Sequence, residues 1–454
     1  YYTGGVFPLS NAMQKMAVYF WPRRTEASVV FMTATAGEPA AAADLSVERV
    51  PGRLPAHRLA GKRTARSAGL YWEDPTVTKC FGENGAAPDA FSRVVGRLSD
   101  LLDFMACDTV IYPAVWYTGP LYASLREAPG QGSDRHPLND YLKMLLLEFE
   151  ERRLRLIPSV NVHELASLRA AANTDFGSIQ AGADTVNAVL GDNTVQKHTW
   201  HHRPPAYNVA HPYVQERLEG LIRELVARCA PSPAFEGVAL HLTVVSPLTF
   251  GFLTAGYDDR TIGRFERETE IEVPVADDDP ERFAGRYEWL TSEAYEPWVR
   301  WRCSVVTDFY RRLADGVRGE DSDRRLVLLM GIPMAKNDHE REKGKEGHSW
   351  LDLAREAGLD IPALAAIPGV TIDPWMCPQD ARWWLRRPQR DPAEAEVIRR
   401  MNWPEEQLQP WFSAPRRGVN LHQRYWETAF GRRQPLDCLW HGSIPWRAGA
   451  VTPS

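Results

Sequence analysis

Short apolar runs, each followed by a loop and an amphipathic stretch, recur along the chain from residue 67 onward. The runs are rich in aliphatic and β-branched residues and predict eight strands, at residues 69–73, 109–117, 154–163, 237–245, 325–333, 370–375, 419–426 and 438–444. Helical periodicity between the runs predicts helices at residues 91–105, 138–152, 214–228, 298–317 and 393–401. Strand and helix therefore alternate along most of the chain.

Alternating strands and helices are typical of a parallel sheet covered by helices, and eight such units favour a (β/α)8 TIM barrel, an α/β fold. We assign the barrel to residues 67–454 and treat residues 1–66 as a β-rich N-terminal segment, part of a larger domain. No helix is predicted after the eighth strand, so either the barrel closes differently or the natural chain continues beyond Ser454. Long insertions at residues 166–211 and 246–281 follow the third and fourth strands, on the face where barrels keep their active sites.

Composition excludes several classes of protein. The chain has 454 residues, a net charge of −6, 44% hydrophobic residues and 25% charged residues, which is typical of a folded globular protein. It has no apolar run long enough to cross a membrane and no basic footprint for nucleic acid. The six cysteines form no CxxC spacing, so we expect no structural zinc site and no disulfide scaffold. Oligomeric state and localisation are not set by the sequence.

Aromatic and polar residues gather at the predicted strand ends. The chain contains 16 tryptophans, and those at five of the eight strand ends are Trp72, Trp116, Trp375, Trp426 and Trp446. Flat indole rings stack on the apolar faces of sugars, and polar side chains bind the hydroxyls. His163, Glu164, Arg424 and His441 lie beside these tryptophans in the sequence. The pattern predicts a carbohydrate site without an organic cofactor or a metal; the alternative is that these tryptophans only fill the barrel mouth.

Three segments of the chain, at residues 256–266, 282–290 and 298–310, resemble the bacterial (β/α)8 glycoside hydrolases of the large retaining superfamily, such as its β-galactosidase and xylanase groups. The resemblance implies hydrolysis of glycosidic bonds in an oligo- or polysaccharide by two carboxyl groups. The family's nucleophile ends the seventh strand, where this chain has Glu427. Its acid/base ends the fourth strand, where residues 241–246 contain no carboxylate.

The missing carboxylate leaves several alternatives open. The nearest candidates for the acid are Asp258, Asp259 and Glu164. We assign Asp258 as the acid and Glu427 as the nucleophile or base, with the alternative that Asp258 only caps the following helix. An inverting enzyme and a non-catalytic carbohydrate-binding or structural barrel are further alternatives. A metal-dependent hydrolase could use the cluster of His198, His201 and His202, although plain loop use is favoured.

Overall fold

The structure is a computed structural model that describes residues 68–72, 75, 77–81, 83, 90–104, 107–130, 140–172, 185–195, 206–243, 246–251, 253–330, 350–374, 419–421 and 438–441. The N-terminal segment 1–66 and the helix expected at residues 393–401 lie outside these residues. In the part of the chain that is described, no helix has both the length and the apolar character needed to span a membrane.

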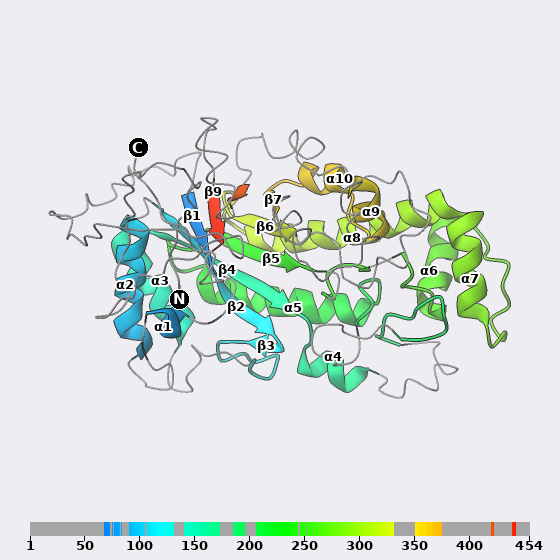
Figure 1. Cartoon of the computed structure of the whole chain (residues 1–454), viewed down its shortest axis with the longest axis horizontal. Coiled ribbons are helices and arrows are strands. Elements are labelled where there is room, and N and C mark those ends of the chain that lie inside the picture. Colours follow the sequence, from blue (N-terminus) through cyan, green and yellow to red (C-terminus); the bar gives the residue numbers. More distant parts are fainter. Residues whose placement is uncertain are drawn as a thin grey trace, which may run out of the picture.

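Eight parallel strands form the centre of the molecule (Figure 1). They are β1 (Ala68–Tyr71), β2 (Thr109–Tyr117), β4 (Arg155–Val162), β5 (Gly237–Leu242), β6 (Arg325–Met330), β7 (Val370–Pro374), β8 (Val419–Leu421) and β9 (Cys438–His441). Each of them falls within one of the strands predicted from the sequence or overlaps it. The unpredicted β3 (Gly119–Pro120) turns back antiparallel to β2.

The strand order is that of a (β/α)8 barrel. Hydrogen-bonded neighbours run β7-β6-β5-β4-β2-β1-β9-β8, so the strands follow chain order around the curled sheet and the last strand returns beside the first. Among the described residues no backbone pairing joins β7 to β8. The predicted fold class is therefore confirmed, as a curled parallel sheet with helices around it.

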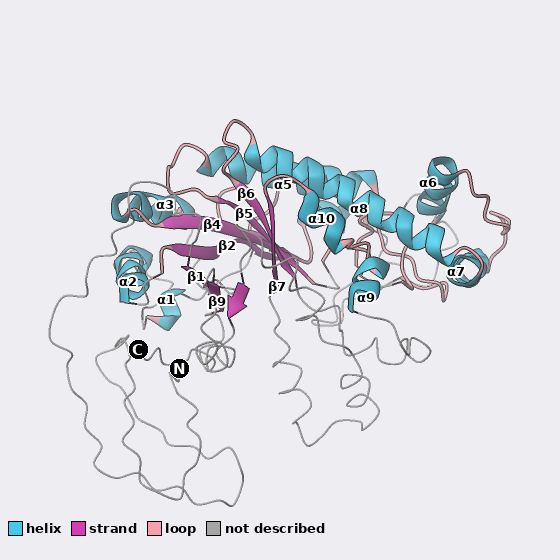
Figure 2. Cartoon of the chain, turned by 90° about the horizontal axis from the view of Figure 1, so that it is seen from above, coloured by secondary structure: helices cyan, strands magenta, loops and turns pink. Residues whose placement is uncertain are grey.

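Helices cover the outer face of the sheet (Figure 2). They include α2 (Ala90–Phe104), α3 (Tyr141–Arg152), α5 (Pro212–Cys229) and α8 (Tyr295–Arg318). The chain also forms the short helices α1 (Val77–Cys80), α4 (Ala166–Ala171), α9 (Trp350–Glu356) and α10 (Ile361–Ala366). Local sequence sets their starts. At the start of α3, the Asp140 carboxylate accepts a hydrogen bond from the N–H of Lys143. Helix α5 begins at Pro212, and the ring of the preceding His211 accepts a hydrogen bond from the N–H of Tyr213.

The insertion after β5 builds two further helices, α6 (Asp259–Thr269) and α7 (Arg282–Ser292), at the end of the molecule remote from α2 and α3 (Figure 1). Aromatic rings hold this insertion to α8: Trp298 packs edge-on to Phe265 at 5.2 Å and lies 5.7 Å from Tyr257. The Asp259 carboxylate accepts hydrogen bonds from Arg282 and Arg286 on α7. The segments that carry the sequence resemblance are thus largely a packed structural unit.

The two faces of the strands have different surroundings. Even-numbered residues of β4, such as Leu156 and Val160, join the large core beneath the helices. Alternate residues of five strands form a separate apolar cluster inside the barrel, made of Tyr71, Ile111, Ile157, Ala239, Val327 and Leu329. This inner cluster identifies which side chains of each strand face the barrel interior.

Candidate functional site at the barrel mouth

A stack of three rings lies at the carboxyl ends of β2 and β4. Trp116 and Tyr117 stack with ring centroids 4.2 Å apart, and Tyr117 stacks in turn on His163 at 4.3 Å. Trp116 and Tyr117 are each half-buried. The sequence identified Trp116 and His163 as site residues, and the structure joins them through Tyr117.

The backbone of Tyr117 fixes this stack. Its φ of 47° lies in the left-handed region that residues other than glycine rarely adopt. The Tyr117 carbonyl accepts the N–H groups of both His163 and Glu164 at 2.9 Å. These two bonds tie the end of β4 to the end of β2 and offset the local strain, so the rings are held by the fold rather than by a free loop.

An open amide lies beside the stack. Asn161 pairs with Trp116 in the β2–β4 register and is 1% exposed. Neither its amide nitrogen nor its amide oxygen has a hydrogen-bond partner in the described part of the chain. Ser159 lies two residues earlier on the same face of β4 and is 1% exposed. Its hydroxyl also has no hydrogen-bond partner among the described residues. A buried polar group without a partner costs about 1–3 kcal/mol, so this pair calls for an explanation.

The floor of the mouth is a hydrogen-bonded pair. The Tyr71 hydroxyl on β1 lies 3.0 Å from Nδ1 of His241 on β5, and their rings meet edge to face at 6.0 Å. Tyr71 belongs to the inner apolar cluster, so this pair rests directly on that layer. His241 pairs with Leu329 of β6, near the carboxyl end of β5.

Glu164 is tied to the ring stack through its backbone, because its N–H donates to the Tyr117 carbonyl. It directly follows His163, is 7% exposed, and forms an ion pair with Arg169 on α4. The sequence analysis predicted Glu164 as a site residue, and it follows the end of β4 at Val162.

Trp72 is a correction to the sequence prediction. It was expected to form a sugar subsite, yet it is 1% exposed and packs in the core beneath the helices, with its ring 6.4 Å from that of Phe81. The physical reason is strand alternation: Tyr71 faces the barrel interior, so its neighbour Trp72 faces the helices.

Asp258 is the second correction. Its carboxylate accepts the N–H of Thr261 at 3.0 Å and a side-chain hydrogen bond from Asn208 at 2.8 Å, and it has no exposed surface. Burial raises its pKa to about 6, against the opposing effect of the hydrogen bonds from Thr261. Asp258 is thus the N-cap of α6, as the alternative interpretation held, and its carboxylate is already bound by Asn208 and Thr261.

Other predicted site residues fall outside the description. Trp375, Arg424, Trp426, Glu427 and Trp446 lie outside the described residues, as does the cluster of His198, His201 and His202. His441 is described through its backbone, which pairs with Tyr71 at the top of β1. The sequence analysis did not assign Tyr71, Tyr117, Asn161 and His241 to the site. Successive side chains of a strand point to opposite faces, and this alternation along β1, β4 and β5 could have identified Tyr71, Asn161 and His241 as inward-facing.

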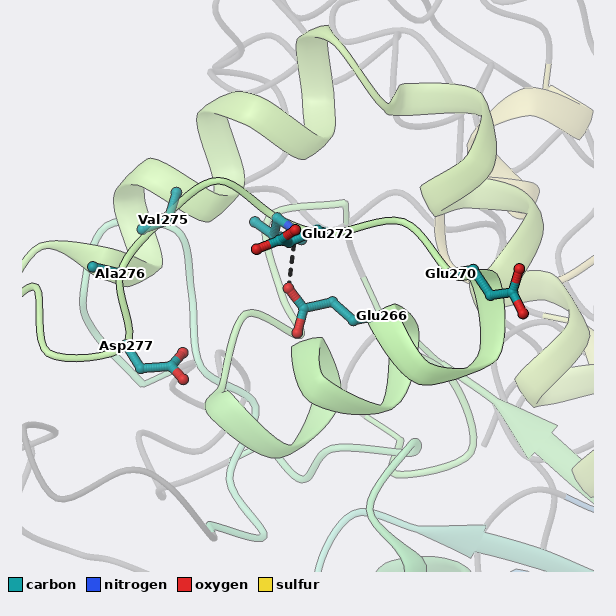
Figure 3. Close-up of a pocket in the computed structure, with 7 residues that line it drawn as sticks. Glu266, Glu270, Glu272, Val275, Ala276 and Asp277 are labelled. Carbon is teal, nitrogen blue, oxygen red and sulfur yellow. Dashed lines mark hydrogen bonds between the residues drawn. The ribbon is translucent and has the colours of Figure 1, made fainter.

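A separate acidic pocket of about 450 Å³ lies at the α6–α7 connection, away from the mouth (Figure 3). Its carboxylates come from Glu266, Glu270, Glu272 and Asp277. Glu266 accepts the backbone N–H of Val273 at 2.9 Å, so it helps to fold the connection. Within the described residues no group of three or more His, Cys, Asp or Glu side chains is arranged to hold a metal ion.

Comparison with known proteins gives structural matches only. No family model matches the chain, and no curated protein matches it. The glycoside hydrolase domain of PgaB (BpsB) from Bordetella bronchiseptica is 12% identical, with a TM-score of 0.49 over 83% of this chain and 94% of that one. The catalytic domain of β-amylase from Paenibacillus polymyxa is 9% identical, with a TM-score of 0.47 over 85% and 95%. A β-galactosidase from the psychrophilic Marinomonas ef1 is 10% identical, with a TM-score of 0.42 over 83% and 54%.

These three structures are glycoside hydrolases, as the sequence resemblance predicted. Their low identities and their TM-scores below 0.5 carry no activity over to this chain. Any assignment of function therefore rests on the chain's own residues at the barrel mouth.

Proposed function

We propose that the chain hydrolyses glycosidic bonds in an oligo- or polysaccharide at the C-terminal mouth of its barrel. The observation that carries the proposal is the stack of Trp116, Tyr117 and His163 beside the open amide of Asn161. Sugars need both kinds of surface, because their ring C–H groups pack on aromatic faces and their hydroxyls need fixed polar partners. The parallel barrel places both at the face that carries the active sites of such folds.

Two carboxyl groups are needed for hydrolysis, one protonated and one ionised. In this proposal Glu427, which follows the predicted seventh strand, is the nucleophile or base. Glu164 takes the place of Asp258 as the second carboxyl, because it lies at the end of β4 next to the stacked rings while Asp258 is buried under α6. Trp375, Trp426 and Trp446 remain proposed sugar platforms, and Arg424 and His441 remain proposed hydroxyl partners.

Release of reducing ends from a panel of plant, fungal and bacterial polysaccharides tests the proposal. The wild type should cleave at least one glycan, and Glu427→Gln and Glu164→Gln should each lower its kcat at least a hundredfold. Asp258→Asn is the matched control, a carboxyl-to-amide change that should leave kcat within a few-fold. Full activity of Glu427→Gln on the glycan that the wild type cleaves would overturn the proposal.

The second candidate function is a non-catalytic carbohydrate-binding barrel. It is favoured by the run from His241 to Tyr257, which contains no carboxylate where the related hydrolases have their acid/base. The first carboxylate after that run, Asp258, is a buried helix cap. This alternative predicts sugar binding without turnover, unchanged by Glu164→Gln or Glu427→Gln.

A further inference from the structure

Asn161 carries a feature that the packing of the chain does not explain. Its amide is buried, and neither the nitrogen nor the oxygen has a partner among the described residues. Asn208 shows the contrast within the same chain. Its buried amide nitrogen donates to Asp258 and Thr261, and its oxygen accepts the N–H of Ala210. The buried amide of Asn208 is thus hydrogen-bonded through both its nitrogen and its oxygen, whereas the buried amide of Asn161 has no hydrogen-bond partner among the described residues.

The open amide faces the barrel interior. Ile157, four residues earlier on β4, belongs to the inner cluster, and Ser159 pairs with Ala239 of that same cluster. Asn161 continues this alternation by one step toward the mouth. Its partner in the register is Trp116, whose indole nitrogen is also buried without a partner in the described part of the chain. Amide, hydroxyl and indole N–H therefore line one wall beside the ring stack.

The chemistry of this wall selects the ligand. A primary amide offers a donor and an acceptor in one plane, which match two adjacent hydroxyl groups, one accepting and one donating. Ser159 and Trp116 beside it are neutral. Glu164 and Arg169 near the ring stack form an ion pair with each other. At the opposite end of β4, β5 and β6, Glu236 pairs with both Arg155 and Arg325. A neutral diol fits such a wall better than a carboxylate or a phosphate, which would need a cation.

We propose that Asn161 binds two adjacent hydroxyls of a pyranose ring whose apolar face contacts Trp116, and that it thereby determines which sugar enters the mouth. The proposal rests on the proposed function in one respect, that carbohydrate binds at the mouth; it requires no turnover. Asn161 is a binding residue here, and Ser159 is a second hydroxyl partner below it.

The test compares Asn161→Leu with Asn208→Leu in the full chain. Tryptophan fluorescence follows titration with methyl β-D-glucopyranoside, methyl β-D-galactopyranoside and methyl β-D-xylopyranoside, and thermal unfolding is recorded without sugar. For Asn161→Leu we expect at least tenfold weaker binding of the glycoside that the wild type binds, with an unchanged or higher Tm, because the Asn161 amide has no hydrogen-bond partner among the described residues. Asn208→Leu should lower the Tm.

Three results would overturn the proposal. They are binding of none of the three glycosides by the wild type, equal binding by Asn161→Leu, and a fall in Tm for Asn161→Leu as large as that for Asn208→Leu. If the wild type cleaves no glycan but Asn161→Leu still weakens sugar binding, the binding proposal is supported and the proposed hydrolase activity is refuted. The two proposals therefore fail separately.

Discussion

The Tyr71 hydroxyl meets Nδ1 of His241 at 3.0 Å, and this hydrogen bond joins β1 to β5 through the barrel interior. Tyr71 belongs to the inner apolar cluster with Ile111, Ile157 and Val327, so the pair joins His241 to that cluster. The bond orients the imidazole near the carboxyl end of β5. We therefore regard it as the positioning element of the site.

Tyr71→Phe should remove this bond and lower the free energy of unfolding by about 1 kcal/mol. Because His241 then loses its orientation, sugar binding should weaken as well. Urea unfolding and fluorescence titration measure the two effects. Tyr310→Phe is the matched control, since the buried Tyr310 hydroxyl donates to the Leu248 carbonyl at 2.8 Å outside the mouth. An equal loss of binding in both variants would contradict a positioning role for Tyr71.

Asp258→Asn should change the pH dependence of stability. Burial raises the pKa of Asp258 in the folded protein to about 6 from 3.8, so the folded state binds this proton more tightly than the unfolded state does. The stability that Asp258 contributes is fully present below about pH 4 and is lost as the pH rises through about 6. Relative to wild type, Asp258→Asn should gain up to about 3 kcal/mol between pH 4 and pH 7. Urea unfolding at several pH values measures this, and a difference that does not vary with pH would contradict it.

Asp259→Ala should destabilise the α6–α7 insertion. Burial alone would raise the Asp259 pKa, but hydrogen bonds from Arg282 and Arg286 hold it below its usual value. Its stabilising effect is therefore present at neutral pH and is lost as the pH falls through that lowered value. Without Asp259 the buried Arg286 keeps the exposed carboxylate of Asp277 and a hydrogen bond of 3.3 Å to the Tyr257 carbonyl. We expect a loss of about 2–4 kcal/mol at pH 7 in urea unfolding.

The control for this change is Asp308→Ala, which removes an exposed partner of Arg311 and should alter stability by less than about 0.5 kcal/mol. Similar losses in the two variants would show that the Asp259 ion pairs do not stabilise the insertion.

Trp72→Ala and Trp116→Ala should separate packing from binding. Trp72 is buried against Phe81, so its removal should cost about 3–5 kcal/mol of stability through the cavity that it leaves. Trp116 is half-buried at the ring stack, so its removal should cost less stability and weaken sugar binding at least tenfold. Thermal unfolding measures the loss of stability, and glycoside titration measures the loss of binding. Weaker sugar binding in Trp72→Ala, with a larger loss of stability in Trp116→Ala, would contradict these assignments and support Trp72 as a sugar-binding residue.

The sequence predicted the eight parallel strands because each is a short aliphatic run, and buried parallel strands have that composition. It could not predict β3, since two residues after a left-handed Tyr117 leave no hydrophobic pattern. Trp72 was assigned to the mouth from its place at a strand end, whereas the face of the strand decides where a side chain lies.

Asp258 shows a second limit of sequence reasoning. From the sequence, an aspartate just before a helix can be either the helix N-cap or a free carboxylate in a loop. For Asp258 the structure decides between the two, because the carboxylate is buried and accepts the N–H of Thr261. Strand alternation could place Asn161 on the inner face of its strand, but the sequence could not show that its amide has no hydrogen-bond partner among the described residues, because that depends on the folded surroundings.

The most direct test of a carbohydrate site at the barrel mouth is an oligosaccharide array probed with the wild type and with Trp116→Ala, after circular dichroism has shown that the variant is folded. We predict that the wild type binds a chemically related set of glycans and that Trp116→Ala binds none of them at the same concentration. Absence of binding by the wild type, or the same set of glycans bound by both proteins, would contradict the account.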